Sequence, residues 1–270
     1  MGRNRWFLPV TSSIGFIFLY APILSLVVFS FNANRLVTVW SGFSTQAYAD
    51  LWADPQLLPA AWLSLQIAAV SATIALVLGT LCAVALVRFR RFRGKTVLQA
   101  TVSAPLVMPD VITGIALLLL FVTMQSLIGW PQGRGVLTII LAHSTFCTAY
   151  VTVVVQSRLA DFDMSLEEAA MDLGASPVRV FFDITLPIIA PALVSGWLLA
   201  FTLSLDDLVI ASFVSGPGSS TLPMIIFSKV RLGVAPEVNA LATIIIGVVA
   251  VGVVVATIYG LRQGTKTKQA

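Results

Sequence analysis

Residues 165–187 read SLEEAAMDLGASPVRVFFDITLP and predict two short helices in succession. Ser165 followed three residues later by Glu168 is typical of a capping box, in which the serine oxygen accepts a backbone N–H and the glutamate reaches back. The first helix would then run from Leu166 to Leu173. Gly174 follows it, and a glycine there can adopt the left-handed conformation that costs other residues about 1–2 kcal/mol. The stretch is therefore predicted to begin with a short helix that has defined ends.

A second start signal follows within the same stretch. Ser176 suits the N-cap position and Pro177 the first helical position, where its missing N–H removes no hydrogen bond. Pro187 marks the place where this element would give way to the next apolar segment. The element has one apolar face, formed at positions i, i+3 and i+4 by Val178, Phe181 and Phe182.

On both sides of this stretch the sequence consists largely of long apolar segments. Of the 270 residues 58% are hydrophobic and 10% are charged, and the mean hydropathy is +0.96. A soluble domain carries about 25% charged residues, so the composition indicates a membrane protein. A membrane-spanning helix needs roughly 20 mainly apolar residues. Six segments reach that length: 7–31, 58–87, 97–124, 136–157, 188–213 and 238–261. We therefore expect an all-α integral membrane protein with six transmembrane helices in one domain, residues 1–270.

Basic residues set the expected orientation of these spans. With the N-terminus in the cytoplasm, twelve basic residues fall in cytoplasmic segments and four fall outside, so the positive-inside rule places both termini in the cytoplasm. The cytoplasmic ones are Arg3, Arg5, Arg88, Arg90, Arg91, Arg93, Lys95, Arg158, Arg179, Arg262, Lys266 and Lys268, and the external ones are Arg35, Arg134, Lys229 and Arg231. The first apolar segment is too long for a signal peptide and no A-x-A site closes it, so we expect it to be retained. The loop 158–187 is then cytoplasmic, and on its helix signals alone it could be an interfacial hairpin.

Several function classes lack support in the sequence. The isoelectric point near 9.4 comes from basic residues in short segments between spans, so we expect no nucleic-acid partner. Cys82 and Cys147 lie in apolar segments without metal-ligand spacing, so we expect no metal site. Gly94-Lys95-Thr96 resembles the end of a phosphate-binding loop, but the first glycine of that motif would fall at Phe89. We therefore expect no cofactor and no enzymatic activity in this chain, whose energy would come from another subunit.

Three carboxylates lie within the predicted spans, at Asp110, Asp206 and Asp207. A charged side chain at the bilayer centre costs roughly 2.5–3.5 kcal/mol, and no Lys or Arg lies deep enough in a span to pair with these. Unpaired carboxylates that face a central path would attract a polycation, so we expect the three residues to line a substrate path. The alternatives are helix capping after Pro109 for the first, and capping or hydrogen bonding at a span end or subunit interface for the other two. His143, the single histidine, is expected to hydrogen-bond to a neighbouring helix.

Within the opening stretch, Glu168-Ala169-Ala170, Gly174 and Ile184-Thr185-Leu186-Pro187 match the pattern E-A-A-x3-G-x9-I-x-L-P without a mismatch. In this pattern, and over its whole length, the chain resembles the permease subunits of ABC importers. The resemblance implies a type I permease fold in which the loop 158–187 is a coupling loop that docks on a partner ATPase and transmits its closure. The residues implied in this coupling are Glu168, Ala169, Ala170, Gly174, Ile184, Leu186 and Pro187.

Five further stretches resemble the spermidine/putrescine permeases, most closely the putrescine-type inner-membrane subunit. They are FLYAP (18–22), SFN (30–32), APLVMPD (104–110), FTLSLDD (201–207) and PEVNALAT (236–243). This resemblance implies ATP-driven import of putrescine or a related polyamine across the bacterial inner membrane, with another cationic solute or an iron complex as the alternative cargo. It implies as partners a homologous second permease, a cytoplasmic ATPase dimer that binds ATP and Mg, a periplasmic polyamine-binding protein and membrane lipid. A secondary transporter would show inverted repeats and an intramembrane enzyme a nucleophile and base at fixed spacing, and neither signature is visible.

Overall fold

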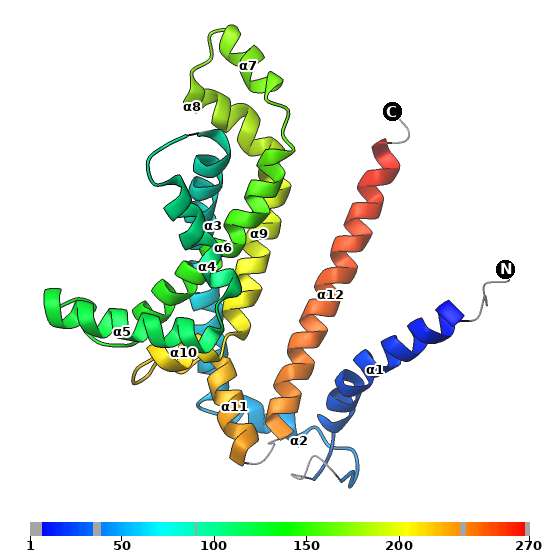
Figure 1. Cartoon of the computed structure of the whole chain (residues 1–270). Helices are drawn as coiled ribbons and strands as arrows, with labels where there is room; N and C mark the ends of the chain where they lie inside the picture. The colour runs from blue at the N-terminus through cyan, green and yellow to red at the C-terminus, as the bar shows by residue number, and fades with distance from the viewer. Residues whose placement is uncertain (1–6, 35–38, 90, 233–235, 268–270) are drawn as a thin grey trace. The chain divides into compact units, whose positions relative to one another are not determined.

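The structure, a computed structural model, describes residues 7–34, 39–89, 91–232 and 236–267 (Figure 1). Of the basic residues that set the expected orientation, Arg3, Arg5, Arg35, Arg90 and Lys268 lie outside the described residues. Within the described part the regular elements are helices, with one isolated antiparallel bridge between Asn32 and Phe43. In chain order they are α1 (Phe7–Phe29), α2 (Gln46–Ala53), α3 (Leu57–Arg88), α4 (Lys95–Val107), α5 (Asp110–Ile128), α6 (Val136–Ala160), α7 (Ser165–Asp172), α8 (Pro177–Val180), the π-helical turn η1 (Phe181–Thr185), α9 (Leu186–Asp206), α10 (Val209–Val214), α11 (Leu222–Leu232) and α12 (Pro236–Thr267).

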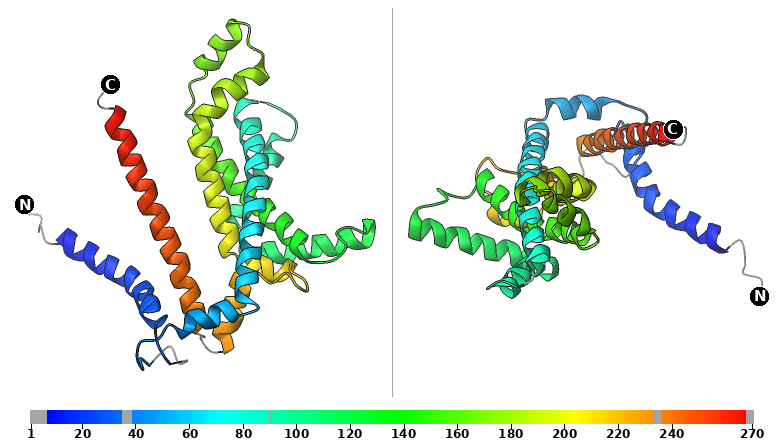
Figure 2. Two further views of the ribbon diagram at one scale, coloured as in Figure 1. Left: turned by 180° about the vertical axis from the view of Figure 1, so that it is seen from behind. Right: turned by 90° about the horizontal axis from the view of Figure 1, so that it is seen from above.

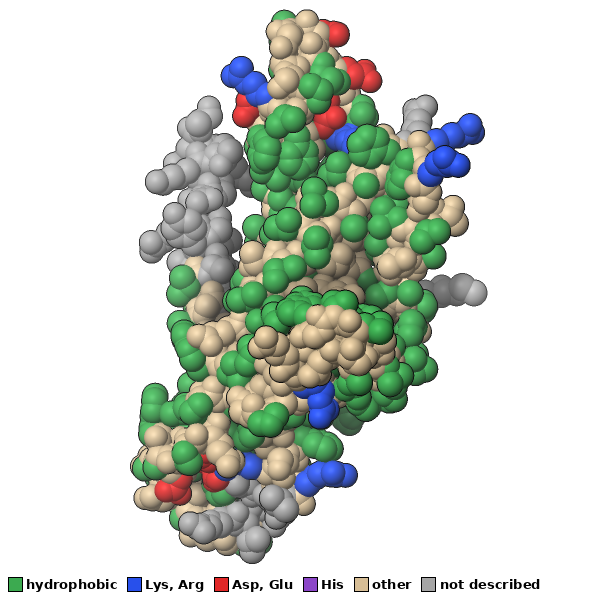
Figure 3. Space-filling model, turned by 90° about the vertical axis from the view of Figure 1, so that its left-hand side faces the viewer, with side chains coloured by type: hydrophobic (Ala, Val, Ile, Leu, Met, Phe, Trp, Pro, Cys, Tyr) green, Lys and Arg blue, Asp and Glu red, His purple; other side chains and the backbone are tan. Residues whose placement is uncertain are grey.

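These helices confirm the expected all-α membrane fold with six spans. Five described stretches are long and apolar enough to cross a membrane, and a sixth apolar stretch, Pro236–Gly252 within α12, is shorter. Large apolar side chains stand exposed along the spans, as with Phe18 at 79% and Leu127 at 78%, which a water-facing surface rarely presents over such lengths. Within residues 59–225, Figure 3 shows charged side chains around the end that carries α7 and apolar side chains over the spans next to it. The five longer stretches are Leu8–Phe29, Leu57–Arg88, Asp110–Ile128, Val136–Ala160 and Pro177–Asp206.

The third predicted span is wrong as a single helix. The segment 97–124 folds as α4 and α5, which are separated by an extended link at Met108 and Pro109, with ψ of 135° and 139°. Proline has no N–H to continue the helical ladder, and it disfavours the helical conformation in the residue before it. Figures 1 and 2 show α5 running across the direction of α3, α6 and α9. The break places Asp110 at the first position of α5.

The fifth predicted span, 188–213, is also divided. Its helix α9 ends at Asp206, Asp207 is extended with ψ of 123°, and the short helix α10 begins at Val209. Both carboxylate oxygens of Asp207 accept backbone hydrogen bonds from the first turns of α10, from the N–H groups of Ile210 (3.2 Å) and Ala211 (2.7 Å). A side chain that satisfies backbone donors in this way offers the chain an alternative to the continuous helix, which accounts for the break.

Contacts group the chain into two compact units, and each is described by itself. Unit 1 consists of residues 1–58 and 226–270, and unit 2 of residues 59–225. The expectation of one domain over residues 1–270 stays a prediction.

In unit 2, α6 is buried along most of its length, and α3 and α9 lie beside it (Figures 1 and 2). Gly79 permits the close approach of α3, because a Cβ there would lie 2.7 Å from Cγ1 of Val151 on α6. The hydroxyl of Ser71 on α3 donates to the carbonyl of Ile140, and the thiol of Cys147 on α6 donates to the carbonyl of Ala200 on α9. Small residues and interhelical hydrogen bonds therefore hold the three helices together.

In unit 1, α12 contacts both α1 and α2, and an ion-pair cluster ties the end of α2 and the start of α12 to α11. Lys229 pairs with Asp54 at 2.6 Å and with Glu237 at 3.3 Å. Burial opposes the charge of Asp54, but hydrogen bonds from Lys229 and from two backbone N–H groups outweigh it and hold the pKa of Asp54 below its usual range. Burial likewise opposes the charge of Lys229, yet its two carboxylate partners raise the pKa of Lys229 above its ordinary value.

Candidate functional site

A cavity of about 300 Å³ opens in unit 2 beside the two breaks in the spans. Its walls come from the start of α5, the middle of α6, the end of α9 and the link to α10. All three carboxylates that the sequence singles out line this one space, although they belong to two different spans. The lining residues are Asp110, Phe146, Tyr150, Leu203, Asp206, Asp207, Leu208 and Val209.

Asp110 and Asp206 are the unpaired carboxylates of this cavity. Both are exposed, and among the residues that the structure describes neither forms an ion pair. Asp110 lies inside the first turn of α5, where the helix dipole favours a negative charge, and the N-cap position belongs to Pro109. Asp206 is the last residue of α9, where the dipole disfavours a negative charge and the final carbonyls lack helical donors. A bound cation would therefore meet unneutralised acceptors here.

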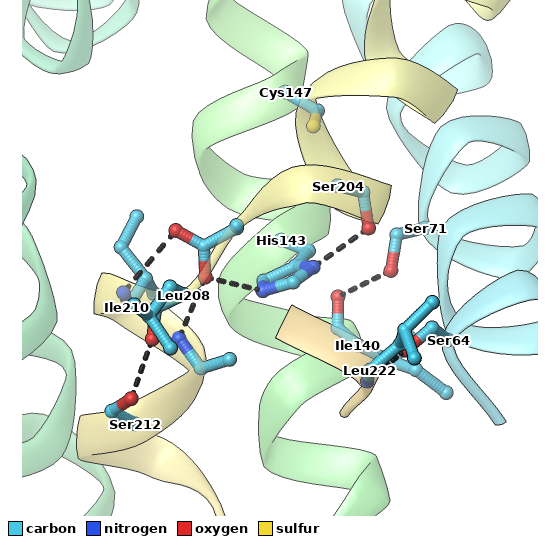
Figure 4. A network of polar contacts seen from close by, with 12 residues as sticks. Ser64, Ser71, Ile140, His143, Cys147, Ser204, Leu208, Ile210, Ser212 and Leu222 are labelled. Atoms are coloured by element: carbon cyan, nitrogen blue, oxygen red, sulfur yellow. Dashed lines mark hydrogen bonds and ion pairs between the residues drawn. The ribbon is translucent and has the colours of Figure 1, made fainter. Parts of the chain in front are cut away.

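Asp207 is held in place by hydrogen bonds, unlike the other two carboxylates. Besides starting α10, it accepts a hydrogen bond from Nε2 of His143 at 3.1 Å. Nδ1 of His143 lies 2.6 Å from Oγ of Ser204 on α9, as Figure 4 shows, and in the neutral ring it accepts the hydroxyl proton. His143 is fully buried, so these two contacts satisfy both of its ring nitrogens. The prediction that His143 bonds to a neighbouring helix is confirmed.

Two aromatic residues of the cavity were missed by sequence reasoning. Phe146 and Tyr150 stand one turn apart on α6, with ring centroids 6.5 Å apart and nearly perpendicular planes. Their i, i+4 spacing places the two rings on one face of α6, one turn after His143, and this spacing was the available signal. That this face lies toward the three carboxylates follows only from the fold. Trp197 of α9 stacks on Phe201 and donates a hydrogen bond to Thr73 of α3, outside the lining of the cavity. It serves helix packing.

The predicted coupling loop contains the expected first helix, but its start differs. Met164 occupies the N-cap position of α7 without a side-chain hydrogen bond, so the predicted capping box from Ser165 to Glu168 is wrong. The carboxylate of Asp163 accepts the N–H of Ser165 at 3.0 Å instead, and this bond holds the pKa of Asp163 below its usual range. A carboxylate two residues upstream competes successfully because it brings a full charge to the helix start.

The end of α7 follows the prediction. Gly174 has φ of +89°, the left-handed region that favours glycine. Its N–H donates to the carbonyl of Met171 at 2.9 Å, and the N–H of Ala175 donates to the carbonyl of Ala170 at 3.1 Å. These two bonds form a Schellman motif, which stops the helix and turns the chain sharply.

The second half of the loop is joined to the fifth span without a break. Ser176 caps α8 by accepting the N–H of Arg179, and Pro177 takes the first helical position, as predicted. Helix α8 then runs through η1 into α9, so that Pro177–Asp206 is one helical stretch. Pro187 was predicted to mark the place where the loop element gives way to the fifth span. The wider π-helical turn η1 before it accommodates the missing N–H of the proline, and the chain continues as a helix.

The residues of the predicted coupling pattern occupy different positions. Glu168, Ala169, Gly174 and Pro187 are exposed, whereas Ala170, Ile184 and Leu186 are partly buried. Large apolar side chains stand beside the exposed ones, above all Leu173 at 90%. The buried acid of α7 is Glu167, which sequence reasoning did not single out. Such a surface on a short helix suits docking against another protein.

Comparison with known proteins places these features in a family. Residues 75–263 match the family model described as the binding-protein-dependent transport system inner membrane component. This chain belongs to that family. The permease family implies a non-enzymatic transport subunit and a multi-pass membrane protein, in agreement with the expectations from the sequence.

Individual relatives support the same family at full length. The putrescine transport system permease protein PotI of Escherichia coli is 64% identical over 252 residues, which cover 93% of this permease and 89% of the relative. The spermidine/putrescine transport system permease protein PotC of the same organism is 44% identical over 249 residues, covering 92% and 91%. In fold, the permease is similar to a chain of a bacterial ABC transporter involved in the import of the acidic polysaccharide alginate, with a TM-score of 0.70, 17% identity and coverage of 96% and 97%.

Proposed function

We propose that this permease imports putrescine or a related polyamine as one subunit of an ATP-driven ABC importer. The observation that carries the proposal is the helical stretch Pro177–Asp206, which joins the coupling loop at one end to a carboxylate of the cavity at the other. Thirty residues at 1.5 Å each give this stretch a length of about 45 Å. A displacement of the loop is therefore delivered directly to the acidic cavity.

The chemistry of the cavity suits a small polycation. At 4 Å a carboxylate and an ammonium attract by roughly 4 kcal/mol at an effective dielectric of 20. Asp110 and Asp206 supply two such partners, while Asp207 adds its charge and holds the start of α10. Phe146 and Tyr150 offer apolar ring faces to the methylene chain between two ammonium groups, and ring faces also attract cations. Few acidic contacts permit release, which transport requires.

The remaining parts of the importer are proposed to be separate chains. ATP and Mg would be bound by a cytoplasmic ATPase dimer, on which α7 docks through Glu168, Ala169, Ala170 and Gly174, with Ile184, Leu186 and Pro187 carrying the movement into α9. A homologous second permease would complete the path, and a periplasmic polyamine-binding protein would deliver the cargo. The chain would lie in the bacterial inner membrane with both termini in the cytoplasm. The high identity to the putrescine permease PotI supports the cargo.

The test is uptake of labelled putrescine and spermidine in cells that lack this chain. We expect the wild-type chain to restore uptake, and Asp206→Asn to reduce kcat/KM at least about tenfold, which corresponds to roughly 1.4 kcal/mol. Asp110→Asn should act in the same direction. Asp50→Asn is the matched control, because Asp50 is an exposed acid on α2 outside the cavity. Unchanged kinetics in both cavity variants would remove these carboxylates from the path.

The same uptake experiment also shows whether the cargo is something other than a polyamine. If the wild-type chain is present in the membrane with its partner subunits and restores no polyamine uptake, the polyamine proposal is wrong. Another cationic solute or an iron complex is then the cargo to test, and the family membership stands.

A further inference from the structure

Glu167 is the buried acid of α7, and it has two partners far from it in sequence. Its Oε1 lies 2.5 Å from Nη2 of Arg88, the last residue of α3. The same oxygen accepts the hydroxyl of Thr185, the last residue of η1. Glu167 and Thr185 are 9% and 1% exposed, so the contact is sheltered from water. One carboxylate oxygen therefore joins α7 to the end of the second span and to the start of the fifth.

Arg88 is held from several sides by the same loop. Its guanidinium lies 5.1 Å from the ring centroid of Phe162, and its Nη1 contacts Sδ of Met164. Both residues belong to the link between α6 and α7. An arginine that meets a carboxylate, a ring face and a thioether in one segment has little freedom to leave it. A sheltered charge pair is also screened less by salt than an exposed one, such as Arg179 with Asp183.

Chain connectivity alone would not give α7 a firm hold on α3. The loop continues directly from α6 and into α8, but α3 ends at Arg88, 79 residues before Glu167. Without the contact with Glu167, a movement of α7 would reach α3 only through the weaker contacts of Arg88 with Phe162 and Met164 and through packing along the spans. With the contact, both α3 and the α8–η1–α9 stretch are bonded to α7 at Glu167.

We propose that Arg88, Glu167 and Thr185 form an anchor that makes α7, the end of α3 and the start of α9 move as one body when the partner ATPase closes. This inference rests on the proposed coupling role of the loop. Glu167 is a positioning residue: it faces inward and acts through the two spans, whereas its neighbour Glu168 faces outward. The anchor sets how much of each ATP-driven movement reaches the cavity.

The direct test measures the rigidity of the anchored body in the assembled importer. Spin labels are placed on Asp172 of α7 and Phe89 after α3, both exposed, in a chain whose Cys82 and Cys147 are replaced. We expect a narrow distance distribution between the labels that is the same without nucleotide and in the vanadate-trapped state. Glu167→Ala should broaden the distribution and shift it on trapping, and Thr185→Val should do so more weakly. A distribution in Glu167→Ala that stays as narrow as in the wild type overturns the proposal.

Coupling is read in the same proteoliposomes as putrescine imported per ATP hydrolysed. Glu167→Ala and Arg88→Ala should each lower this ratio at least fivefold, and the double variant should be no worse than either, because the residues act as one unit. Asp54→Asn is the control: it removes an ion pair of similar length and burial in unit 1 and should leave the ratio unchanged. Equal ratios in wild type and Glu167→Ala also overturn the anchor. If the wild type imports no putrescine, the proposed cargo fails, and the label distances still decide the anchor.

Discussion

At the scale of single residues, adjacent carboxylates have different tasks. Asp206 and Asp207 are neighbours at the end of α9, yet Asp206 lies open to the cavity without an ion pair among the described residues, whereas Asp207 bonds His143 and two backbone N–H groups. Both residues line the cavity, but only Asp207 lies where its oxygens also reach His143 of α6 and the N–H groups at the start of α10. A charge in a span is therefore not by itself evidence of contact with substrate.

This difference predicts opposite effects of two substitutions. Asp207→Ala leaves buried His143 without its acceptor and uncaps α10, which should cost roughly 1–3 kcal/mol of stability. Asp206→Ala removes a side chain that forms no ion pair within the described part of the chain, and it should leave stability within about 0.5 kcal/mol of the wild type. Thermal unfolding of the purified importer in detergent measures both, and Asp207→Asn, which keeps an acceptor oxygen, should lie between them. Equal stability of the two alanine variants would contradict the assignment.

A second residue-scale prediction concerns pH and the cluster in unit 1. Because the pKa of Asp54 is lowered in the folded state, its stabilisation is present above the ordinary pKa of an aspartate, about 3.9, and is lost as pH falls through the folded value. Because the pKa of Lys229 is raised, its contribution is present below the ordinary lysine value, about 10.4, and is lost as pH rises through the folded value. The cluster should thus stabilise unit 1 over the whole neutral range.

Asp54→Asn tests this window. At pH 7 the substitution should lower the free energy of unfolding by about 1–3 kcal/mol, since it removes a charged hydrogen bond from a partly buried cluster. The difference between variant and wild type should shrink as pH falls below about 4. A difference that is independent of pH between 7 and 3 would show that the charge of Asp54 contributes nothing.

At the scale of elements, the sharp end of α7 is the feature that fits a mechanical role. Gly174→Ala forces a side chain into the left-handed region at φ of +89°, at a local cost of about 1–2 kcal/mol, although no other atom lies within 4 Å of the new Cβ. The strain should shift the end of α7 without disturbing insertion. We expect normal membrane abundance and ATP hydrolysis with at least a several-fold loss of transport. Retained transport in Gly174→Ala would count against the coupling role.

Local chemistry explains which elements the sequence could predict. The predictions of a left-handed Gly174 and of a helix start at Ser176-Pro177 are confirmed. In both cases the hydrogen-bond donor and acceptor are only a few residues apart in sequence, so the local pattern is sufficient. The capping box of Ser165 fails because Asp163 competes for the same donor, a choice between two local solutions that the pattern alone does not rank. The break at Asp207 is made by local bonds to the N–H groups of Ile210 and Ala211, but the bond that also fixes this side chain comes from His143, 64 residues away, and requires the fold.

At the scale of the whole molecule, the class of fold could be predicted from composition. A membrane span is recognised from a run of apolar residues in one segment, and this does not require knowing which segments contact each other. The presence of carboxylates in the spans could also be read from the sequence, and their cost in a membrane marked them as candidates for a site. The cavity itself could not, because its walls combine the start of α5, the end of α9 and the aromatic pair of α6. The contact of Glu167 with Arg88 likewise needs two segments that are distant in sequence.

The orientation of the chain is the last prediction, and it follows from where the basic side chains lie. Of the described segments, those around Arg88, Arg158 and Arg179 carry the basic excess, and moving such charges across the membrane during insertion is disfavoured. Cysteines are introduced singly by Asp183→Cys on η1 and Asp50→Cys on α2, in a chain without Cys82 and Cys147.

Both positions are exposed, so a membrane-impermeant maleimide can reach whichever one faces it. In spheroplasts we expect labelling at position 50 within minutes and labelling at position 183 only after lysis. The reverse pattern would place the coupling loop outside, where no ATPase could reach α7, and would refute the proposed direction of transport together with the anchor. Labelling at both positions before lysis would instead show that the spheroplasts leak, which a cytoplasmic marker enzyme detects.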